Sequence, residues 1–180
     1  GYEILPWLIR YARTLKKPYF TMTGRFHKSW GDFGGVRTEA ALLFDLYNSI
    51  ANGGTCSIGD HMHPRGKLDK AVYDLVEKVY SKTKMLDPFT EGAEPVTEMA
   101  VIEPVLSMVP GTYFDEEESS MKGAARMLME LKCQFDVIDG KGDLSKYSII
   151  ILPDNITLDN QLKAKLQSHL KKGGIIISSA

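Results

Sequence analysis

The sequence predicts an α/β fold built from parallel strands, and three observations support this. Short apolar runs, such as PYFTMT at 18–23 and IIIS at 175–178, alternate with longer stretches of helical period. Polar loops follow the first two of the expected strands. A stretch with prolines, a glycine and acidic residues separates two such series. Strands alternating with helices form parallel βα units, whose ligand sites lie at the carboxyl ends of the strands.

The first half of the chain is predicted to contain two βα units after an initial helix. Thr38 and Asp69 are of the residue types preferred at helix N-caps, and Asn52-Gly53-Gly54 is typical of a helix end. The expected elements are a helix at 2–15, a strand at 19–23, a helix at 38–51, a strand at 55–58 and a helix at 69–82. We assign residues 1–85 to this first domain.

Residues 86–97 (LDPFTEGAEPVT) are predicted to be a linker, because they carry two prolines, a glycine and three acidic residues without a period. Residues 98–180 then repeat the α/β alternation. The expected elements are strands at 98–102, 135–138, 148–152 and 175–178, helices at 119–131 and 159–171, and a loop at 103–117. This succession predicts a flavodoxin-like parallel sheet in the order 2-1-3-4.

The apolar final strand and the small number of βα units lead us to expect an internal piece of a larger protein. Two such units are too few to close a barrel of eight, and an apolar strand needs neighbours on both edges. On this expectation the chain holds the end of one α/β domain and the beginning of a second, incomplete one.

Composition limits the classes of partner. The formal net charge of −1 argues against a nucleic-acid-binding surface. No apolar run approaches the roughly 20 residues needed to span a bilayer, so no membrane partner is expected. Cys56 and Cys133 lie far apart without metal-binding spacing and are interpreted as buried free thiols. We predict no cofactor and no bound metal, and nothing indicates a cellular compartment.

The first strand is followed by a loop that carries several ligand-binding residue types, TGRFHKSWGDFGG at 23–35. Arg25 can form paired hydrogen bonds, and His27 can donate or accept a proton near neutral pH. Trp30 offers a flat apolar face on which a sugar ring can stack. Asp32 can accept hydrogen bonds from hydroxyls or act as a general base. The alternative is structural: an Arg–Asp ion pair and a tryptophan that hold a long loop in place.

The second strand leads into a similar loop, within GGTCSIGDHMHPRG at 53–66. Sugar-hydroxyl recognition by Asp60 and His63, with Arg65 as a nearby cation, is the favoured interpretation. His61 and His63 have the His-x-His spacing of half a metal site, which Asp60 or His27 could help to complete. No second cluster of carboxylates and histidines is present to finish the coordination shell. A metal-dependent hydrolase therefore stays an alternative.

The second half contains no comparable cluster. It has no GxSxG or GxCxG nucleophile motif, and Lys141-Gly142 lacks the spacing of a phosphate-binding loop. His169 lies in the charged helical stretch KAKLQSHLKK and is expected to be solvated. No catalytic group is expected in this half.

Several of these features resemble a known family. Residues 98–180 contain a strand ending in DVI, the turn DLSKY, an apolar strand ending in LP, and a helix closing in GG before another apolar strand. This pattern resembles the trimerisation domain of family 42 β-galactosidases, which has a class I glutamine-amidotransferase-like fold without the amidotransferase cysteine. Residues 1–85, with GRFHKSWGDFGG and GGTCSIGDHMHPRG, look like the last two βα units of a (β/α)8 barrel. The barrel belongs to a related group of glycoside hydrolases, some of them described as α-L-fucosidase-like.

The sequence departs from that family at the nucleophile. In family 42 the nucleophile is a glutamate at the end of the seventh barrel strand, and Thr23 stands at about that position here. The family's acid/base glutamate belongs to the fourth strand, which this chain does not contain. A retaining mechanism needs two carboxyl groups roughly 5–5.5 Å apart. Asp32 and Asp60 are the best-placed carboxylates in the sequence.

The resemblance implies a part of a glycoside hydrolase that contributes substrate-binding loops and an oligomerisation domain and is inactive alone. The expected partners are a carbohydrate substrate and further copies of the chain, with a trimer as one form. Two alternatives stay open: a non-catalytic carbohydrate-binding or oligomerisation module, and a metal-dependent hydrolase using His61 and His63. The predicted catalytic residues are Asp32 and Asp60, and the predicted substrate-binding residues are Arg25, His27, Trp30, His61, His63 and Arg65.

Overall fold

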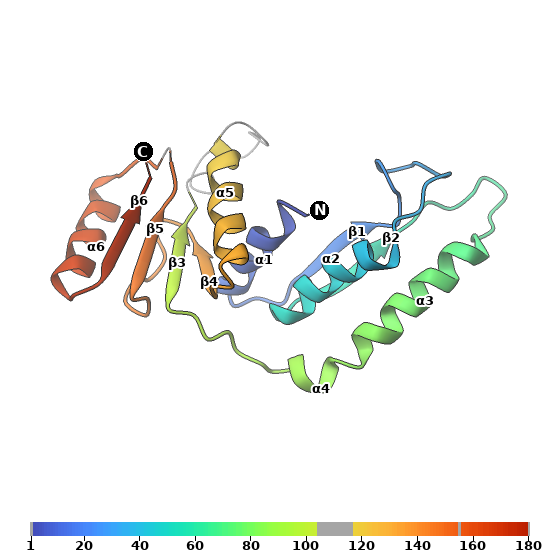
Figure 1. Cartoon of the computed structure of the whole chain (residues 1–180), viewed down its shortest axis with the longest axis horizontal. Coiled ribbons are helices and arrows are strands. Elements are labelled where there is room, and N and C mark those ends of the chain that lie inside the picture. Colours follow the sequence, from blue (N-terminus) through green and yellow to red (C-terminus); the bar gives the residue numbers. More distant parts are fainter. Residues whose placement is uncertain (1, 104–116, 155, 180) are drawn as a thin grey trace. The chain divides into compact units, whose positions relative to one another are not determined.

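The computed structural model describes residues 2–103, 117–154 and 156–179 (Figure 1). The chain divides into two compact units. The first unit comprises Gly1–Leu5 and Lys16–Glu94, and the second comprises Pro6–Leu15 and Pro95–Ala180. The first helix therefore groups with the second unit, whereas the sequence-based boundaries placed it within residues 1–85. None of the helices in the described ranges has the length and apolar character needed to cross a bilayer.

The helices and strands follow the predicted alternation closely. In chain order they are α1 (Leu5–Thr14), β1 (Phe20–Gly24), α2 (Glu39–Ala51), β2 (Thr55–Gly59), α3 (Lys70–Lys84), α4 (Asp87–Thr90), β3 (Met99–Ile102), α5 (Glu117–Glu130), β4 (Phe135–Ile138), β5 (Ile149–Leu152), α6 (Asn160–Lys171) and β6 (Ile175–Ser178). The side chains of Thr38, Asp69 and Asp159 accept hydrogen bonds from backbone N–H groups of the first turns they cap. The predicted linker contains the one-turn helix α4, and the predicted loop at 103–117 falls almost wholly outside the described residues.

In the first unit, β1 and β2 form a parallel pair whose register runs from Phe20 opposite Thr55 to Gly24 opposite Gly59. One face of this pair is covered by α2 and α3. On that face Cys56 and Ile58 of β2 pack against a core that contains Leu42 and Val79. On the opposite face Phe20 and Met22 are 67% and 59% exposed.

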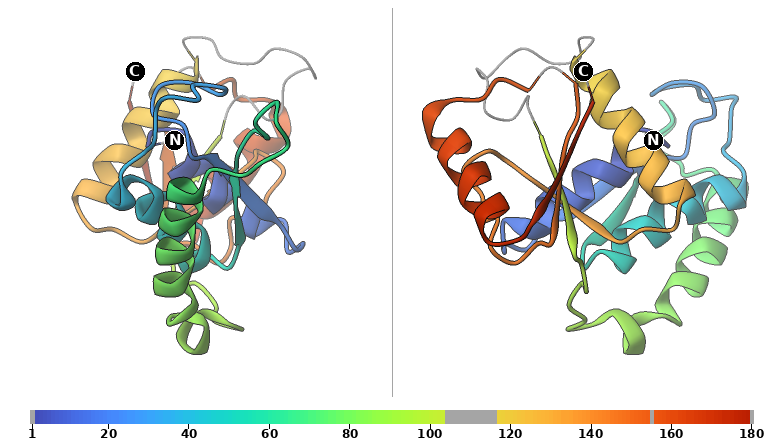
Figure 2. Two further views of the ribbon diagram at one scale, coloured as in Figure 1. Left: turned by 90° about the vertical axis from the view of Figure 1, so that its right-hand side faces the viewer. Right: turned by 60° about the vertical axis from the view of Figure 1, so that its left-hand side comes forward.

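In the second unit, four parallel strands form a sheet in the order β4-β3-β5-β6. Numbered along the chain this is 2-1-3-4, so the predicted flavodoxin-like order is confirmed. The connections through α5 and α6 run in opposite directions from the centre of the sheet, and the two helices lie on opposite faces (Figure 2). This is what right-handed crossovers require. The core on the α6 side includes Ile102, Ile150, Leu162 and Leu166.

A buried charge pair attaches α1 to this sheet. Asp136 on β4 is 1% exposed, and its Oδ1 accepts hydrogen bonds from the guanidinium of Arg13 at 2.9 and 2.7 Å. Its Oδ2 accepts from the hydroxyls of Tyr147 at 2.7 Å and Thr97 at 3.0 Å, and from Lys146 at 3.1 Å. Every oxygen of this buried carboxylate therefore has a partner, which burial of a charge requires.

His169 is buried rather than solvated, which corrects the sequence-based expectation. His169 is only 7% exposed, and its Nε2 lies 3.3 Å from the carbonyl oxygen of Ile175. The ring occupies the space beside Gly174, where a Cβ would come within 2.2 Å of it. The charged neighbours of His169 in sequence lie on other sides of α6, because a helix turns by about 100° per residue.

Candidate functional site

The loops that follow β1 and β2 meet at the carboxyl ends of the two strands. We call residues 25–37 the first loop and residues 60–69 the second loop. The backbone N–H of Arg25 donates to the carbonyl of Gly59 at 3.0 Å. The guanidinium Nε of Arg25 donates to Oδ1 of Asp60 at 2.8 Å, and these two side chains are only 4% and 11% exposed. A buried ion pair thus joins the two loops.

Arg25 also holds the first loop together. Its Nη1 donates to the carbonyl oxygens of Phe33 at 3.1 Å and Gly35 at 2.9 Å. Its guanidinium lies 4.4 Å from the centre of the Phe26 ring, and its carbonyl accepts the backbone N–H of Arg37 at 2.8 Å. With its donors used in this way, Arg25 acts as an internal support. This is the structural alternative considered for that residue.

Trp30 lies over the ends of both strands. The indole passes so close to two glycines that a Cβ at Gly59 would come within 2.3 Å of it and a Cβ at Gly24 within 3.2 Å. Gly24 and Gly59 are partners in the strand register, so together they leave a gap one side chain wide on the sheet. Trp30 fills this gap and remains 55% exposed. The result is a firmly seated aromatic surface at the carboxyl end of the sheet.

His61 connects the second loop to this surface. Its ring centre lies 5.2 Å from those of Phe26 and Trp30 and 5.4 Å from that of Phe33, each in an edge-to-face arrangement. We call Phe26, Trp30, Phe33 and His61 the aromatic cluster. Edge-to-face packing is the favourable geometry for such rings, so the cluster is a stable feature of the loop pair. His61 stands within it, while Asp60 Oδ1 accepts its backbone N–H at 2.7 Å.

Asp32 and His27 lie on the outer part of the first loop. The Oδ2 of Asp32 accepts a hydrogen bond from the backbone N–H of Lys28 at 3.4 Å. A Cβ at Gly35 would come within 2.2 Å of that oxygen and 2.9 Å of the Cβ of His27, so the loop closes tightly here. Asp32 therefore turns toward its own loop, and His27 is exposed.

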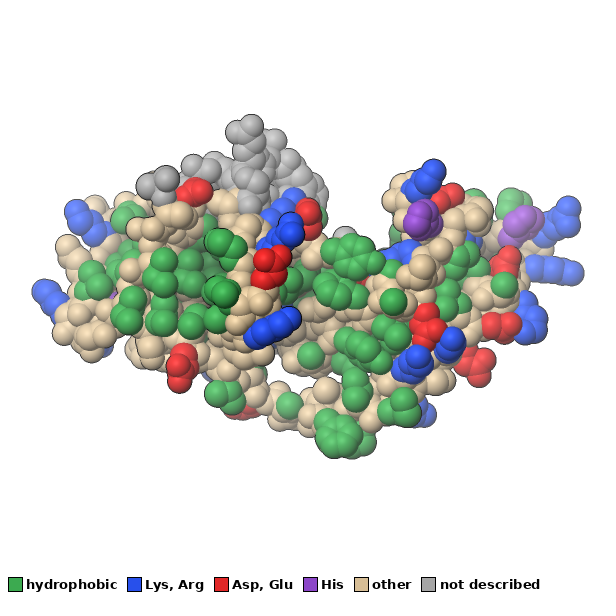
Figure 3. Space-filling model, viewed as in Figure 1, with side chains coloured by type: hydrophobic (Ala, Val, Ile, Leu, Met, Phe, Trp, Pro, Cys, Tyr) green, Lys and Arg blue, Asp and Glu red, His purple; other side chains and the backbone are tan. Residues whose placement is uncertain are grey.

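His63 and Arg65 lie on the exposed tip of the second loop. The Nδ1 of His63 accepts the backbone N–H of Arg65 at 3.2 Å, which is a local turn contact. Figure 3 shows histidine side chains on the surface, among charged side chains of both signs. Over the described ranges, no group of three or more His, Cys, Asp or Glu side chains could hold a metal ion. The pairing of Asp60 with Arg25 and the packing of His61 on aromatic rings give the metal-hydrolase alternative no support.

A buried polar network at the end of β1 was missed by the sequence analysis. The Thr23 hydroxyl donates to Oδ2 of Asp45 on α2 at 2.6 Å, and Arg37 donates to the same oxygen at 2.7 Å. Arg37 also donates to the carbonyl of Ala41 at 2.9 Å. Burial opposes the charge of Arg37, but its hydrogen bonds and charge interactions with Asp45 and Tyr2 together outweigh burial and raise the pKa of the guanidinium.

This network changes the interpretation of Thr23. Because side chains alternate along a strand, Thr23 points toward α2, while Met22 and Gly24 belong to the opposite face. A group that acts at the open face of β1 would stand at 22 or 24 and not at 23. Arg37 and Asp45 could have been suspected only from knowing that β1 packs on α2.

Comparison with solved structures gives a consistent class. The chain matches an α-L-fucosidase, isoenzyme 2 from Paenibacillus thiaminolyticus, with a TM-score of 0.87 and 34% identity over 100% of this chain and 27% of that protein. It matches a cold-adapted β-galactosidase from Rahnella sp. R3 with a TM-score of 0.74 and 18% identity, over 96% of this chain and 29% of that protein. It also matches a family 42 β-galactosidase from G. stearothermophilus, solved as a catalytic mutant. That match has a TM-score of 0.70 and 17% identity, and covers 97% of this chain and 29% of that protein.

These matches are between (β/α)8-barrel glycosidases and a chain that spans between 27% and 29% of their length. The two β-galactosidases, below 20% identity, share the fold. The fucosidase is similar in sequence as well. The chain is therefore related to the glycoside hydrolases, and its relatives include the α-L-fucosidase and the family 42 β-galactosidases. No protein-family description and no curated sequence matches the chain.

Proposed function

We propose that this chain is part of a glycoside hydrolase in which the first and second loops form one wall of the sugar-binding site. The observation that carries this proposal is the seating of Trp30 on the paired glycines at the carboxyl ends of β1 and β2. Ligand sites of βα units lie at this end of the strands. An exposed, immobilised indole is a suitable surface for the apolar face of a sugar ring.

The proposed roles follow from the contacts. Trp30 stacks against the sugar, and His61, held edge-on to it, offers a ring nitrogen to a hydroxyl. His27 and His63, which are exposed, make further hydroxyl contacts, together with Arg65. Arg25 is a positioning residue, because its donors already serve Asp60 and the first loop.

The two predicted catalytic carboxylates have different support. Asp60 is paired with Arg25 at 2.8 Å, which favours a role in holding the loops. Asp32 has a single weak backbone contact and keeps more freedom to reach a substrate. We propose that the catalytic carboxylates of the complete enzyme include at least one group from outside this chain, and that this chain alone does not hydrolyse sugars.

The substrate class is proposed from the relatives. The fucosidase is 34% identical over the whole chain, about twice the identity of the β-galactosidases. We therefore expect the complete enzyme to prefer a nitrophenyl α-L-fucoside to a nitrophenyl β-D-galactoside. A preference for the galactoside would contradict this substrate assignment without affecting the proposed role of Trp30 as a sugar-stacking surface.

The proposed stacking surface formed by Trp30 is tested by three substitutions in the complete enzyme. Trp30→Ala removes the stacking surface, and Gly59→Ala forces the indole to move, because the new Cβ would clash with it. Both should raise KM by about tenfold, the value of one lost aromatic contact. Gly34→Ala, in the same loop, has open space around its Cβ position and is the matched control. Equal kinetics for all three variants would contradict the proposal.

A non-catalytic module is the second candidate, and one observation favours it. Strands β1 (FTMTG) and β2 (TCSIG) carry no carboxylate, so the open face of this sheet lacks a nucleophile of its own. This candidate predicts sugar binding without turnover by the complete protein. We further propose that the second unit is its oligomerisation domain, resembling an amidotransferase-like trimerisation domain. The exposed Ile175 and Ile177 on β6 support such a contact, which sedimentation of the intact protein would measure.

A further inference from the structure

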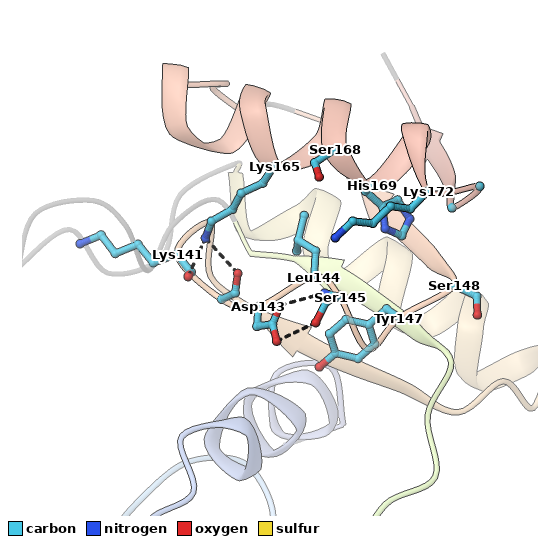
Figure 4. Close-up of a pocket in the computed structure, with 13 residues that line it drawn as sticks. Lys141, Asp143, Leu144, Ser145, Tyr147, Ser148, Lys165, Ser168, His169 and Lys172 are labelled. Atoms are coloured by element: carbon cyan, nitrogen blue, oxygen red, sulfur yellow. Dashed lines mark hydrogen bonds between the residues drawn. The ribbon is translucent and has the colours of Figure 1, made fainter.

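A cavity of about 550 Å³ lies in the second unit, away from the aromatic cluster in the sequence and independent of the proposed glycosidase function (Figure 4). It opens between the turn at 141–148 and the C-terminal half of α6. Ser148 directly precedes β5, and Gly173-Gly174 directly precede β6, so the cavity lies at the amino ends of these strands. Its volume falls within the range of about 300–1,000 Å³ typical of small-molecule sites.

One wall of the cavity is a braced turn. The ammonium group of Lys165 donates to the carbonyl oxygens of Gly140, Lys141 and Gly142 at 3.2, 2.7 and 3.0 Å. The carboxylate of Asp143 accepts the backbone N–H and the hydroxyl of Ser145, both at 2.9 Å. The acidic side chain that lines the cavity is thus occupied within the turn, and the turn is held against α6.

The other wall is the end of α6. The buried ring of His169 lies against Gly174 and fixes the helix end to the start of β6. Ser168 and Lys172 are four residues apart and share one side of the helix, which faces the cavity (Figure 4). Within the described part of the chain, neither the Ser168 hydroxyl nor the Lys172 ammonium group has a hydrogen-bond or ion-pair partner.

The lining is positive. Lys165 and Lys172 face a single aspartate, Asp143, whose charge is already hydrogen-bonded, while the side chain of Lys141 points away from the cavity (Figure 4). A cavity walled by lysines attracts anions, and lysine serves as a point charge for phosphate oxygens. Serine hydroxyls add directed donors beside that charge.

We propose that this cavity binds the phosphate group of a small molecule, with the Lys172 ammonium group and the Ser168 hydroxyl as direct contacts. Lys165, which also lies on α6, adds the charge of its ammonium group at the turn that this group holds. The sequence signals at Lys141-Gly142 and His169, which the glycosidase function does not use, both belong to this cavity. Neither has phosphate-loop spacing in sequence, because the site is made by two segments that meet only in the fold.

The test is a titration of the full chain with inorganic phosphate at constant ionic strength. Binding is monitored by the NMR chemical shifts of the backbone amides. Saturable shifts are expected at residues 141–148 and 168–174, and none with chloride. Lys172→Ala should weaken binding by about tenfold and Ser168→Ala by about threefold, as for the loss of one charged and one neutral hydrogen bond. Both positions are exposed, Ser168 on α6 and Lys172 at its C-cap, so the fold should persist.

Lys171→Ala is the matched control, since it removes the same charge from the adjacent residue, which does not line the cavity. It should leave phosphate affinity within about twofold, because an exposed charge that makes no direct contact with the ligand contributes little binding energy. Equal weakening by Lys171→Ala and Lys172→Ala would overturn the site and leave only general attraction of phosphate to basic surface. Absence of saturable shifts in the unsubstituted chain would overturn it outright.

Discussion

The two units carry their exposed polar chemistry at opposite ends of parallel strands. In the first unit the aromatic cluster and its histidines follow β1 and β2, at the carboxyl ends. In the second unit the lysine-lined cavity lies at the amino ends of β5 and β6. Catalytic groups of βα proteins collect at the carboxyl ends, which is consistent with the substrate-binding role proposed for the first unit. The amino-end cavity fits a binding role without chemistry.

The units share one device, a buried arginine–aspartate pair, but use it differently. Arg25–Asp60 joins two loops, and the carboxylate has few other partners. Arg13–Asp136 joins a helix to a sheet, and hydroxyls of Tyr147 and Thr97 complete its shell. We expect the second pair to contribute more to folding and the first to contribute more to the geometry of the site.

The largest effect is expected for Asp136→Ala. It leaves the buried guanidinium of Arg13 without its carboxylate, and breaking such a pair costs about 3–5 kcal/mol. The two tryptophans separate the units: Trp7 lies in the second and Trp30 in the first. Urea unfolding followed by fluorescence in a Trp30→Phe background, with Trp7 as reporter, should show the loss of stability.

The same substitution in a Trp7→Phe background supplies the control. If the units unfold separately, Asp136→Ala should leave the Trp30 transition unchanged. Equal shifts of the urea transition in both backgrounds would show that the units unfold together. They would contradict the view that the Arg13–Asp136 pair stabilises the second unit alone.

Most of the fold was predictable because it depends on local signals. The apolar period, the N-caps at Thr38 and Asp69, and the glycine helix ends define the elements, and the handedness rules define the sheet order. The grouping of α1 with the second unit was not predictable. It rests on contacts between Arg13 and Asp136, which are 123 residues apart in sequence.

A smaller effect is expected for Asp60→Asn. The amide oxygen can still accept from Arg25, but the ion pair is lost, at a cost of about 1–3 kcal/mol to the first unit. Trp30 fluorescence in the Trp7→Phe background measures this. His63→Ala, on the exposed tip of the same loop, is the control and should stay within about 0.5 kcal/mol. Full stability combined with lost glycosidase activity of the complete enzyme would instead make Asp60 a catalytic residue.

That the two loops lie side by side was predictable from the sequence, and the contacts of their individual residues were less so. Arg25, Trp30 and Asp60 were identified from residue type at a strand end, and the structure brings their two loops together. That Arg25 is internal and Trp30 exposed depends on which side of the loop each faces, and residue type does not specify this. The glycine pair under Trp30 needed the strand register, which only pairing of β1 with β2 defines.

The smallest effect is expected when low pH protonates Asp136 and lowers the free energy of unfolding of the second unit. Burial alone would raise the pKa of the Asp136 carboxyl, but the Tyr147 hydrogen bond and the charges of Arg13 and Lys146 outweigh burial and lower it. Because the folded pKa lies below the unfolded value of about 3.9, the stabilisation is complete above that pH. It is lost as the pH falls through the folded pKa. The protonated group keeps its hydrogen-bonding atoms, so the loss is smaller than for Asp136→Ala.

Unfolding of the Trp30→Phe background measured by urea between about pH 6 and pH 2.5 checks this. The free energy of unfolding reported by Trp7 should fall below about pH 4, and Asp136→Asn should reduce that slope because its amide does not titrate. An identical slope in both proteins would mean that other carboxylates govern acid unfolding. The comparison of the two units would then rest on geometry alone, with no special part for the Arg13–Asp136 pair.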